Sequence, residues 1–228
     1  MFSADQYKVI IESVLENGLV SSTDWMQNSS TSVYFLRHDI DFCVDSARDT
    51  AELEKNIGVS STYFFMMSSN MYNVFSKRNQ CLISEIKEMG HKISLHFDPT
   101  AYNTLDAFHL EKNSFESLFG VNVDIVSIHR PGPFLDNNNI SLFGVRHTYQ
   151  DKFFKQMKYI SDSGGVDPSN SVKDYLSDKE GKGLQLLLHP IWWQSKSKGA
   201  TETLNEWTNK HNNLIKSEVR SNCKTYLD

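Results

Sequence analysis

Hydrophobic and polar positions along this chain follow two spacings, one typical of helices and the other of short buried strands. Apolar residues recur every three or four positions in the helical segments and run with little interruption in the strands. The expected helices cover 4–17, 44–57, 78–89, 105–118 and 201–222. The expected strands cover 33–41, 61–67, 91–97, 124–129, 144–149, 158–161 and 184–189. Strand and helix repeats of this length indicate parallel strands with right-handed crossovers, in an α/β barrel or an open doubly wound sheet.

Composition is ordinary for a globular enzyme and adds limits on partners. The 228 residues are 39% hydrophobic and 22% charged, and no linker or repeat divides them, so we expect a single catalytic domain over 1–228. The net charge of -5 offers no basic surface to nucleic acid or to anionic lipid, so neither is an expected partner. The sequence leaves the oligomeric state open.

Cysteine usage and the N-terminal segment indicate the compartment. Cys43, Cys81 and Cys223 are odd in number and widely spaced, which predicts free thiols in a reducing environment. The N-terminus lacks a basic stretch followed by an apolar run, and no apolar run approaches the roughly 20 residues that span a bilayer. We therefore expect a cytoplasmic protein.

Polar side chains that can carry chemistry follow several of the expected strands. Ligands of parallel α/β folds bind at the carboxyl ends of the strands, where loops from many strands meet. Acids, imidazoles and a guanidinium stand at four such ends: Asp39, Asp41, His96, Asp98, His129, Arg130 and His189. We expect these residues to share one rim of the sheet.

Asp39 and Asp41 are two residues apart in an extended segment, so both carboxylates face one side while His38 and Ile40 face the other. Carboxylates so close repel one another unless a cation binds. A metal held by one of them leaves the other as a general base. The alternative is a helix cap or a turn, where Asp is common.

The histidines also allow two interpretations. His96 is either a hydrogen-bonded core residue or a metal ligand at the end of its strand, where Asp98 and the proline after it follow. His91 begins the same strand, at the opposite end, and is expected to be structural. The segment HRPGPF holds His129 in a stiff, proline-bounded loop. Its Arg130 is suited to a forked pair with a carboxylate, or to a solvated surface turn.

His189 ends the most apolar strand, and two tryptophans follow it. Trp192 and Trp193 are placed to form either the aromatic wall of a sugar subsite or part of the core. Asp98, Asp162 and Trp192 are taken as candidates for contact with a substrate.

Taken in order, these segments resemble the motifs of the polysaccharide deacetylase superfamily, also called the NodB-homology or carbohydrate esterase family four fold. The family's first motif is an aspartate pair, and RHDID here supplies Asp39 in the position of the base and Asp41 in that of a metal ligand. The second motif has two histidines; GHKISLH supplies His96, but Thr100 stands where the other would be. His129 is therefore chosen as the third ligand, with Asp98 as the alternative.

The remaining motifs also have counterparts. HRPGPF resembles the Arg-Pro loop, so Arg130 resembles the arginine that orients the base. LLLH resembles the strand ending in histidine, which gives His189 the role of the acid, and Asp162 in YISDSGG is the candidate acid that polarises it. The resemblance spans about 33–190 and is closest to a divergent branch of surface-polysaccharide (O-antigen) biosynthesis proteins.

This resemblance implies a distorted (β/α)7-type barrel and hydrolysis of an N-acetyl group on an amino sugar. It implies a divalent metal that lowers the pKa of bound water to roughly 7, and the His and Asp ligands favour zinc. Asp39 would take the water's proton and His189 would protonate the departing amine. The expected partner is an acetamido sugar. A catalytically silent sugar-binding module and a metal-independent amide hydrolase are the alternatives.

Overall fold

The computed structural model describes residues 2–26, 33–135, 140–178, 182–195 and 199–226. Its centre is one sheet in which each pair of neighbouring strands is parallel. The strands are β1 (Val20–Ser21), β2 (Val33–Ile40), β3 (Thr62–Phe65), β4 (Lys92–Phe97), β5 (Ile125–Ile128), β6 (Arg146–His147), β7 (Lys158–Ser161) and β8 (Leu184–Leu187). Their order is β6-β5-β4-β3-β2-β8-β7, and β1 pairs with the start of β2.

The sheet is curled rather than flat. Arg37 in β2 donates a hydrogen bond to Ser127 in β5, although β3 and β4 lie between these strands. Side chains so far apart in strand order meet only if the sheet bends around them. Among the described residues no pairing joins β6 to β7, so the barrel stays open there. The structure therefore confirms the distorted α/β barrel.

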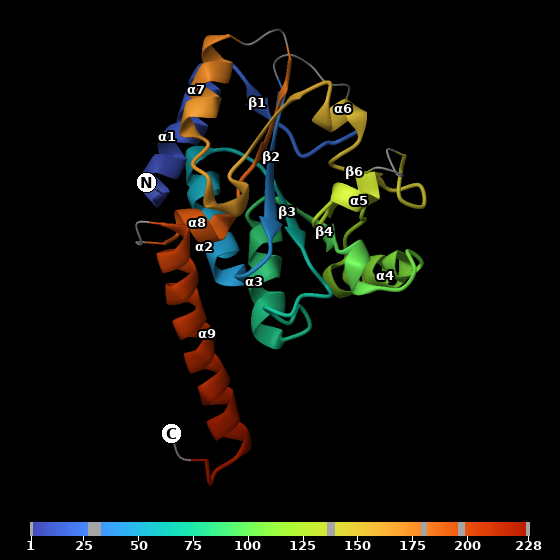
Figure 1. Ribbon diagram of the computed structural model, residues 1–228, viewed down its shortest axis with the longest axis vertical. Coiled ribbons are helices and arrows are strands. Elements are labelled where there is room, and N and C mark those ends of the chain that lie inside the picture. The colour runs from blue at the N-terminus through green and yellow to red at the C-terminus, as the bar shows by residue number, and fades with distance from the viewer. Residues whose placement is uncertain (1, 27–32, 136–139, 179–181, 196–198, 227–228) are drawn as a thin grey trace.

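Helices cover the outer face of the sheet (Figure 1). The helices of the described residues are α1 (Ala4–Glu16), α2 (Val44–Ile57), α3 (Lys77–Glu88), α4 (Ala107–Phe119), α5 (Gly132–Leu135), α6 (Asp151–Phe154), α7 (Ser169–Ser177), α8 (Pro190–Trp193) and α9 (Ala200–Asn222), of which α9 does not cover the sheet. Gly58 ends α2 in the left-handed conformation, with φ at 87°, which glycine adopts without steric cost. Figure 1 shows α9 leaving the body beside α8 and pointing away from the sheet.

The inward side chains of β2 form successive layers that set the depth of the site. Phe35 lies in an apolar cluster with Trp25, Phe64 and others, and its ring stacks on Trp25 at 4.3 Å. Arg37 occupies the next layer and Asp39 the one above it, both buried. Because the apolar cluster fills the lower part of the barrel, polar groups gather only at the carboxyl ends of the strands.

Two further observations bear on the sequence-based expectations. Cys43, Cys81 and Cys223 are free thiols, as predicted. Across the described parts of the chain, no helix combines the length and the apolar character needed to cross a membrane.

Candidate metal centre and active site

Asp41, His96 and His129 come together at the carboxyl ends of β2, β4 and β5. One potential ligand atom from each of them lies within 4.8 Å of the others, as in a metal site. Asp41 Oδ1 lies 3.2 Å from His96 Nε2. Asp41 Oδ1 thus has an ion-pair partner, whereas His96 Nδ1 is buried without a hydrogen-bond partner among the described residues. A buried polar atom without a partner is costly, and the nitrogen and oxygen atoms of these three side chains fit a bound cation.

The charges around His96 favour a cation in the same place. Burial by itself would lower the pKa of His96, but the carboxylates of Asp39 and Asp41 outweigh burial and raise it. The site thus has a negative potential that attracts positive charge, whether a proton or a metal ion. A set of two imidazoles and one carboxylate, with room for a further ligand, is typical of catalytic zinc.

The His129 ring is held in place by Asp98, and Asp98 is held in turn by Thr100. His129 Nδ1 lies 2.9 Å from Asp98 Oδ2, which leaves Nε2 of this ring for a metal. Thr100 in turn donates its backbone N–H and its hydroxyl to Asp98 Oδ1, at 2.8 and 2.6 Å. Burial alone would raise the pKa of Asp98, but hydrogen bonds from Thr100 and His129 lower it. Asp98 is therefore placed to orient a ligand, as carboxylates beside metal-bound histidines commonly do.

Asp39 lies against this centre and is held by a buried arginine. Arg37 Nε and Nη2 donate to the two Asp39 oxygens at 2.9 and 2.6 Å, and the Ser127 hydroxyl donates to Oδ2 at 2.8 Å. Asp39 Oδ2 is 3.8 Å from His96 Nε2. Burial would raise the pKa of Asp39, but Arg37 and then His96 bring it well below the usual range. Asp39 is thus ionised at neutral pH, the form that a proton acceptor needs.

Arg37 fills the position that the sequence had assigned to Arg130. Arg130 lies exposed at the loop after His129, with a left-handed φ of 47°. Arg37 is fully buried, and it also donates to Gln185 Oε1 at 3.1 Å and lies over the Tyr149 ring at 4.6 Å. The sequence reasoning missed Arg37. Its signal was a charged residue inside the apolar strand VYFLRH, which needs a buried partner.

His189 also lies close to Asp41, and its ring is oriented by the buried carboxylate of Asp162. Its Nε2 lies 3.8 Å from Asp41 Oδ2, and its Nδ1 lies 2.6 Å from Asp162 Oδ1. Asp162 also accepts hydrogen bonds from the His189 backbone N–H and from Trp193 Nε1, the latter at 2.7 Å. Burial would lower the pKa of His189, but Asp162, then Asp41 and Asp39, raise it to about 9. His189 is therefore disposed to hold a proton.

The other sequence candidates lie outside this constellation. Trp192, in α8, is 5% exposed and belongs to an apolar cluster with residues of α1 and β8, so its role in substrate binding stays a prediction. His38 faces away from the site, as expected, and its Nε2 lies 2.8 Å from Glu54 in α2. His91 is buried with Nε2 2.9 Å from the Ala51 carbonyl, which agrees with a structural role.

No protein-family model matches the chain, and no curated protein matches it either. Solved structures do show a likeness. A chitin deacetylase from Colletotrichum lindemuthianum has a TM-score of 0.48 and 14% identity, covering 78% of this chain and 81% of its own. A peptidoglycan N-acetylglucosamine deacetylase domain from Eubacterium rectale has a TM-score of 0.46 and 14% identity, covering 78% and 83%. A peptidoglycan deacetylase from Bacillus subtilis has a TM-score of 0.49 and 12% identity, covering 83% and 94%. At 12–14% identity and TM-scores below 0.5, none of these structures shows the activity of this chain.

Proposed function

We propose that this chain is a metal-dependent hydrolase that removes the acetyl group from an acetamido sugar, in a surface polysaccharide or in its activated sugar precursor. One observation carries the proposal. Three side chains suited to a metal, Asp41, His96 and His129, lie between an ionised acid and a histidine disposed to hold a proton. Metal-assisted amide hydrolysis needs these three components at one place.

Asp41, His96 and His129 would hold the metal, and zinc suits this set of nitrogen and oxygen ligands. Such an ion polarises a carbonyl and makes a nearby water more acidic. Asp98 would orient His129 from behind, and Thr100 would hold Asp98. His129, which directly follows β5, would thus take the place of the second histidine of the family motif.

The protein's own groups supply the proton transfers. Asp39 accepts a proton from the attacking water as the water oxygen bonds to the amide carbon. Nε2 of His189 then gives a proton to the amide nitrogen as the carbon–nitrogen bond breaks, which releases the amine and acetate. Arg37 keeps Asp39 ionised and fixed, while Asp162 fixes the ring of His189 with Nδ1 turned inward. Arg37 and Asp162 are therefore positioning residues.

The test is acetate release from acetamido sugars by protein reconstituted with zinc, alongside measurement of its metal content. Asp39→Asn should keep the metal and lose acetate release, because the amide cannot accept the proton. Because this change also leaves Arg37 buried without its counter-charge, the metal content and circular dichroism spectrum of the variant must match those of a folded protein. Asp106→Asn is the matched control, since Asp106 is exposed at the start of α4, and it should retain full activity.

Each other outcome has a defined meaning. Full activity in Asp39→Asn would refute the assigned base. A wild-type protein that binds zinc but releases no acetate would indicate a silent binding module, and activity that withstands complete removal of metal would indicate a metal-independent hydrolase.

A further inference from the structure

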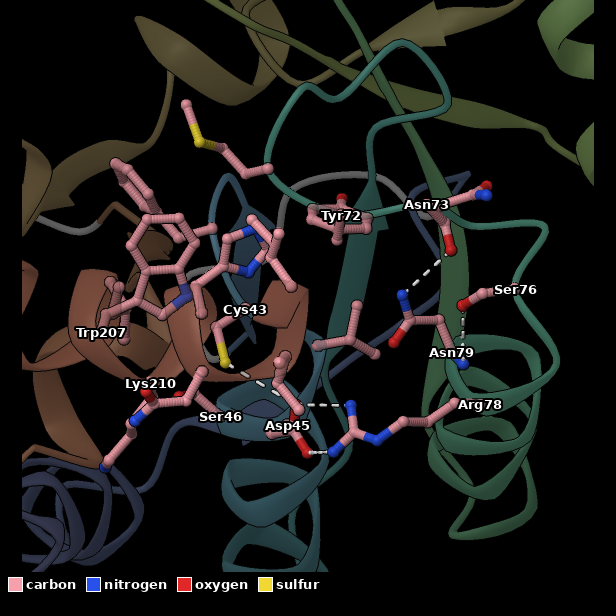
Figure 2. A pocket seen from close by; sticks show the side chains of 18 of the residues that line it. Cys43, Asp45, Ser46, Tyr72, Asn73, Ser76, Arg78, Asn79, Trp207 and Lys210 are labelled. Carbon is pink, nitrogen blue, oxygen red and sulfur yellow. Dashed lines mark hydrogen bonds and ion pairs between the residues drawn. The ribbon is translucent and has the colours of Figure 1, made fainter. Parts of the chain in front are cut away.

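A large groove adjoins the candidate active site. It lies between α9 on one side and the N-terminal ends of α2 and α3 on the other, with a volume of about 1060 Å³. Figure 2 shows Trp207 and Lys210 of α9 on one wall and Arg78 and Asn79 of α3 on the opposite wall, with Cys43 between them. Ligand pockets commonly measure about 300–1,000 Å³, so this groove has room for a group much larger than one sugar ring.

The groove lies next to the catalytic cavity and shares part of its lining. The small cavity that contains Asp39, Asp41 and His189 is also lined by Phe42, Cys43 and Ile191. The same three residues, Phe42, Cys43 and Ile191, line the large groove. A molecule whose acetamide lies between Asp39 and His189 would therefore extend into the groove with its adjoining part.

The wall of the groove is mainly apolar, although α9 is otherwise a polar helix. Trp207 packs edge-on against Phe42, with ring centroids 5.5 Å apart. Farther along α9, Leu214, Ile215 and Val219 line the groove with exposed fractions of 52%, 50% and 38%. Their spacing from Trp207 puts them along one helix face. Aliphatic side chains of this kind offer no hydrogen bonds to sugar hydroxyls.

We propose that the substrate carries a large apolar group next to its acetamido sugar, and that this group lies in the groove between α9 and α3. The occupant is the hydrocarbon part of a glycolipid. This inference rests on the proposed function for the sugar end, and for the lipid end on the apolar wall of the groove and on its position next to the catalytic cavity. Burial of the exposed apolar face of α9 against the hydrocarbon would provide the binding energy.

The test compares three acetamido substrates: the methyl and octyl glycosides of N-acetylglucosamine, and N-acetylglucosamine trisaccharide. The octyl glycoside, used below its micellar concentration, should be hydrolysed with a kcat/KM roughly tenfold or more above that of the methyl glycoside, because several methylenes become buried. The double variant L214S/I215S should lose most of this advantage without changing kcat/KM for the methyl glycoside. Leu110→Ser is the control, because Leu110 is 69% exposed on α4 and does not line the groove.

A binding measurement separates this inference from the proposed activity. Titration calorimetry with octyl glucoside, which has no acetamide, should show binding to the wild type and to Leu110→Ser, and at least roughly tenfold weaker binding to L214S/I215S. That result supports the groove even if no acetate is released from any substrate. Equal kcat/KM for the methyl and octyl glycosides, with no calorimetric binding, would overturn the inference. A preference for the trisaccharide that L214S/I215S abolishes would also overturn it. The same holds if sedimentation shows a dimer that depends on α9 while octyl glucoside does not bind.

Discussion

The buried pair between Arg37 and Asp39 allows a prediction with a clear magnitude. Their side chains are 0% and 4% exposed, and the two direct hydrogen bonds measure 2.9 and 2.6 Å. Replacing Arg37 with Met leaves the Asp39 carboxylate buried without its counter-charge. Breaking a buried pair in this way costs about 3–5 kcal/mol, a large share of the 5–15 kcal/mol typical of whole domains. For a chain of this length, each kcal/mol lowers Tm by roughly 2–4 °C.

The assay is urea unfolding followed by circular dichroism, with Arg48→Met as the matched control. Arg48 also pairs with carboxylates, Glu52 and Glu85, but its side chain is 29% exposed and theirs are about half exposed. Exposed pairs contribute about 0–1 kcal/mol, so Arg48→Met should change the free energy of unfolding little. Adding Asp39→Asn to Arg37→Met should recover part of the loss, because the unpaired charge is gone. The reasoning is refuted if Arg37→Met costs no more than Arg48→Met.

Three further predictions concern groups around the site. Burial would raise the pKa of Glu54, but His38 and its other partners lower it from 4.5 to about 2. Ionised Glu54 therefore contributes about 3 kcal/mol to the free energy of unfolding above pH 4.5, and this contribution is lost as the pH falls toward 2. Glu54→Gln should lose less stability than the wild type over this pH range in acid unfolding curves, and an equal loss would contradict the assignment. Asp98→Asn should weaken zinc binding by roughly 10–100-fold in a chelator competition, because His129 loses its orienting carboxylate; unaltered affinity would contradict the orienting role of Asp98. Asp162→Asn should lower kcat by roughly 100-fold or more while the metal content stays unchanged, and equal losses of kcat and metal would show a structural role instead.

The sequence predicts the repeated part of the fold because long apolar runs and regular helical spacing carry it. Strands such as Val33–Ile40 and Lys92–Phe97 and the helix Val44–Ile57 fall close to their expected bounds. Local patterns fail where an element is short or polar. The helix Ser169–Ser177 buries only Val172 and Tyr175, and the strand Val20–Ser21 has two residues, so neither leaves a periodic signal.

The sequence also predicts some residues of the site better than others. Residues that end a strand, such as Asp41, His96 and His129, can be recognised from their place in the sequence, and the structure brings these three together. Arg37 also lies on the same face of β2 as Asp39, two residues away, so the local pattern indicates that they can pair. The contact of Arg37 with Ser127 in β5 joins residues far apart in the sequence, so the local pattern does not predict it. The single-domain prediction for 1–228 and the proposed roles of the site residues remain predictions.

The most direct test of the central claim is a crystal structure of zinc-loaded protein with anomalous data collected on both sides of the zinc absorption edge. The account predicts one strong anomalous peak coordinated by Asp41, His96 and His129, with Asp98 bonded to His129 and not to the ion. It predicts that the peak disappears in His129→Ala. A peak bound by Asp98 in place of His129, or no peak at this position in fully loaded protein, would contradict it.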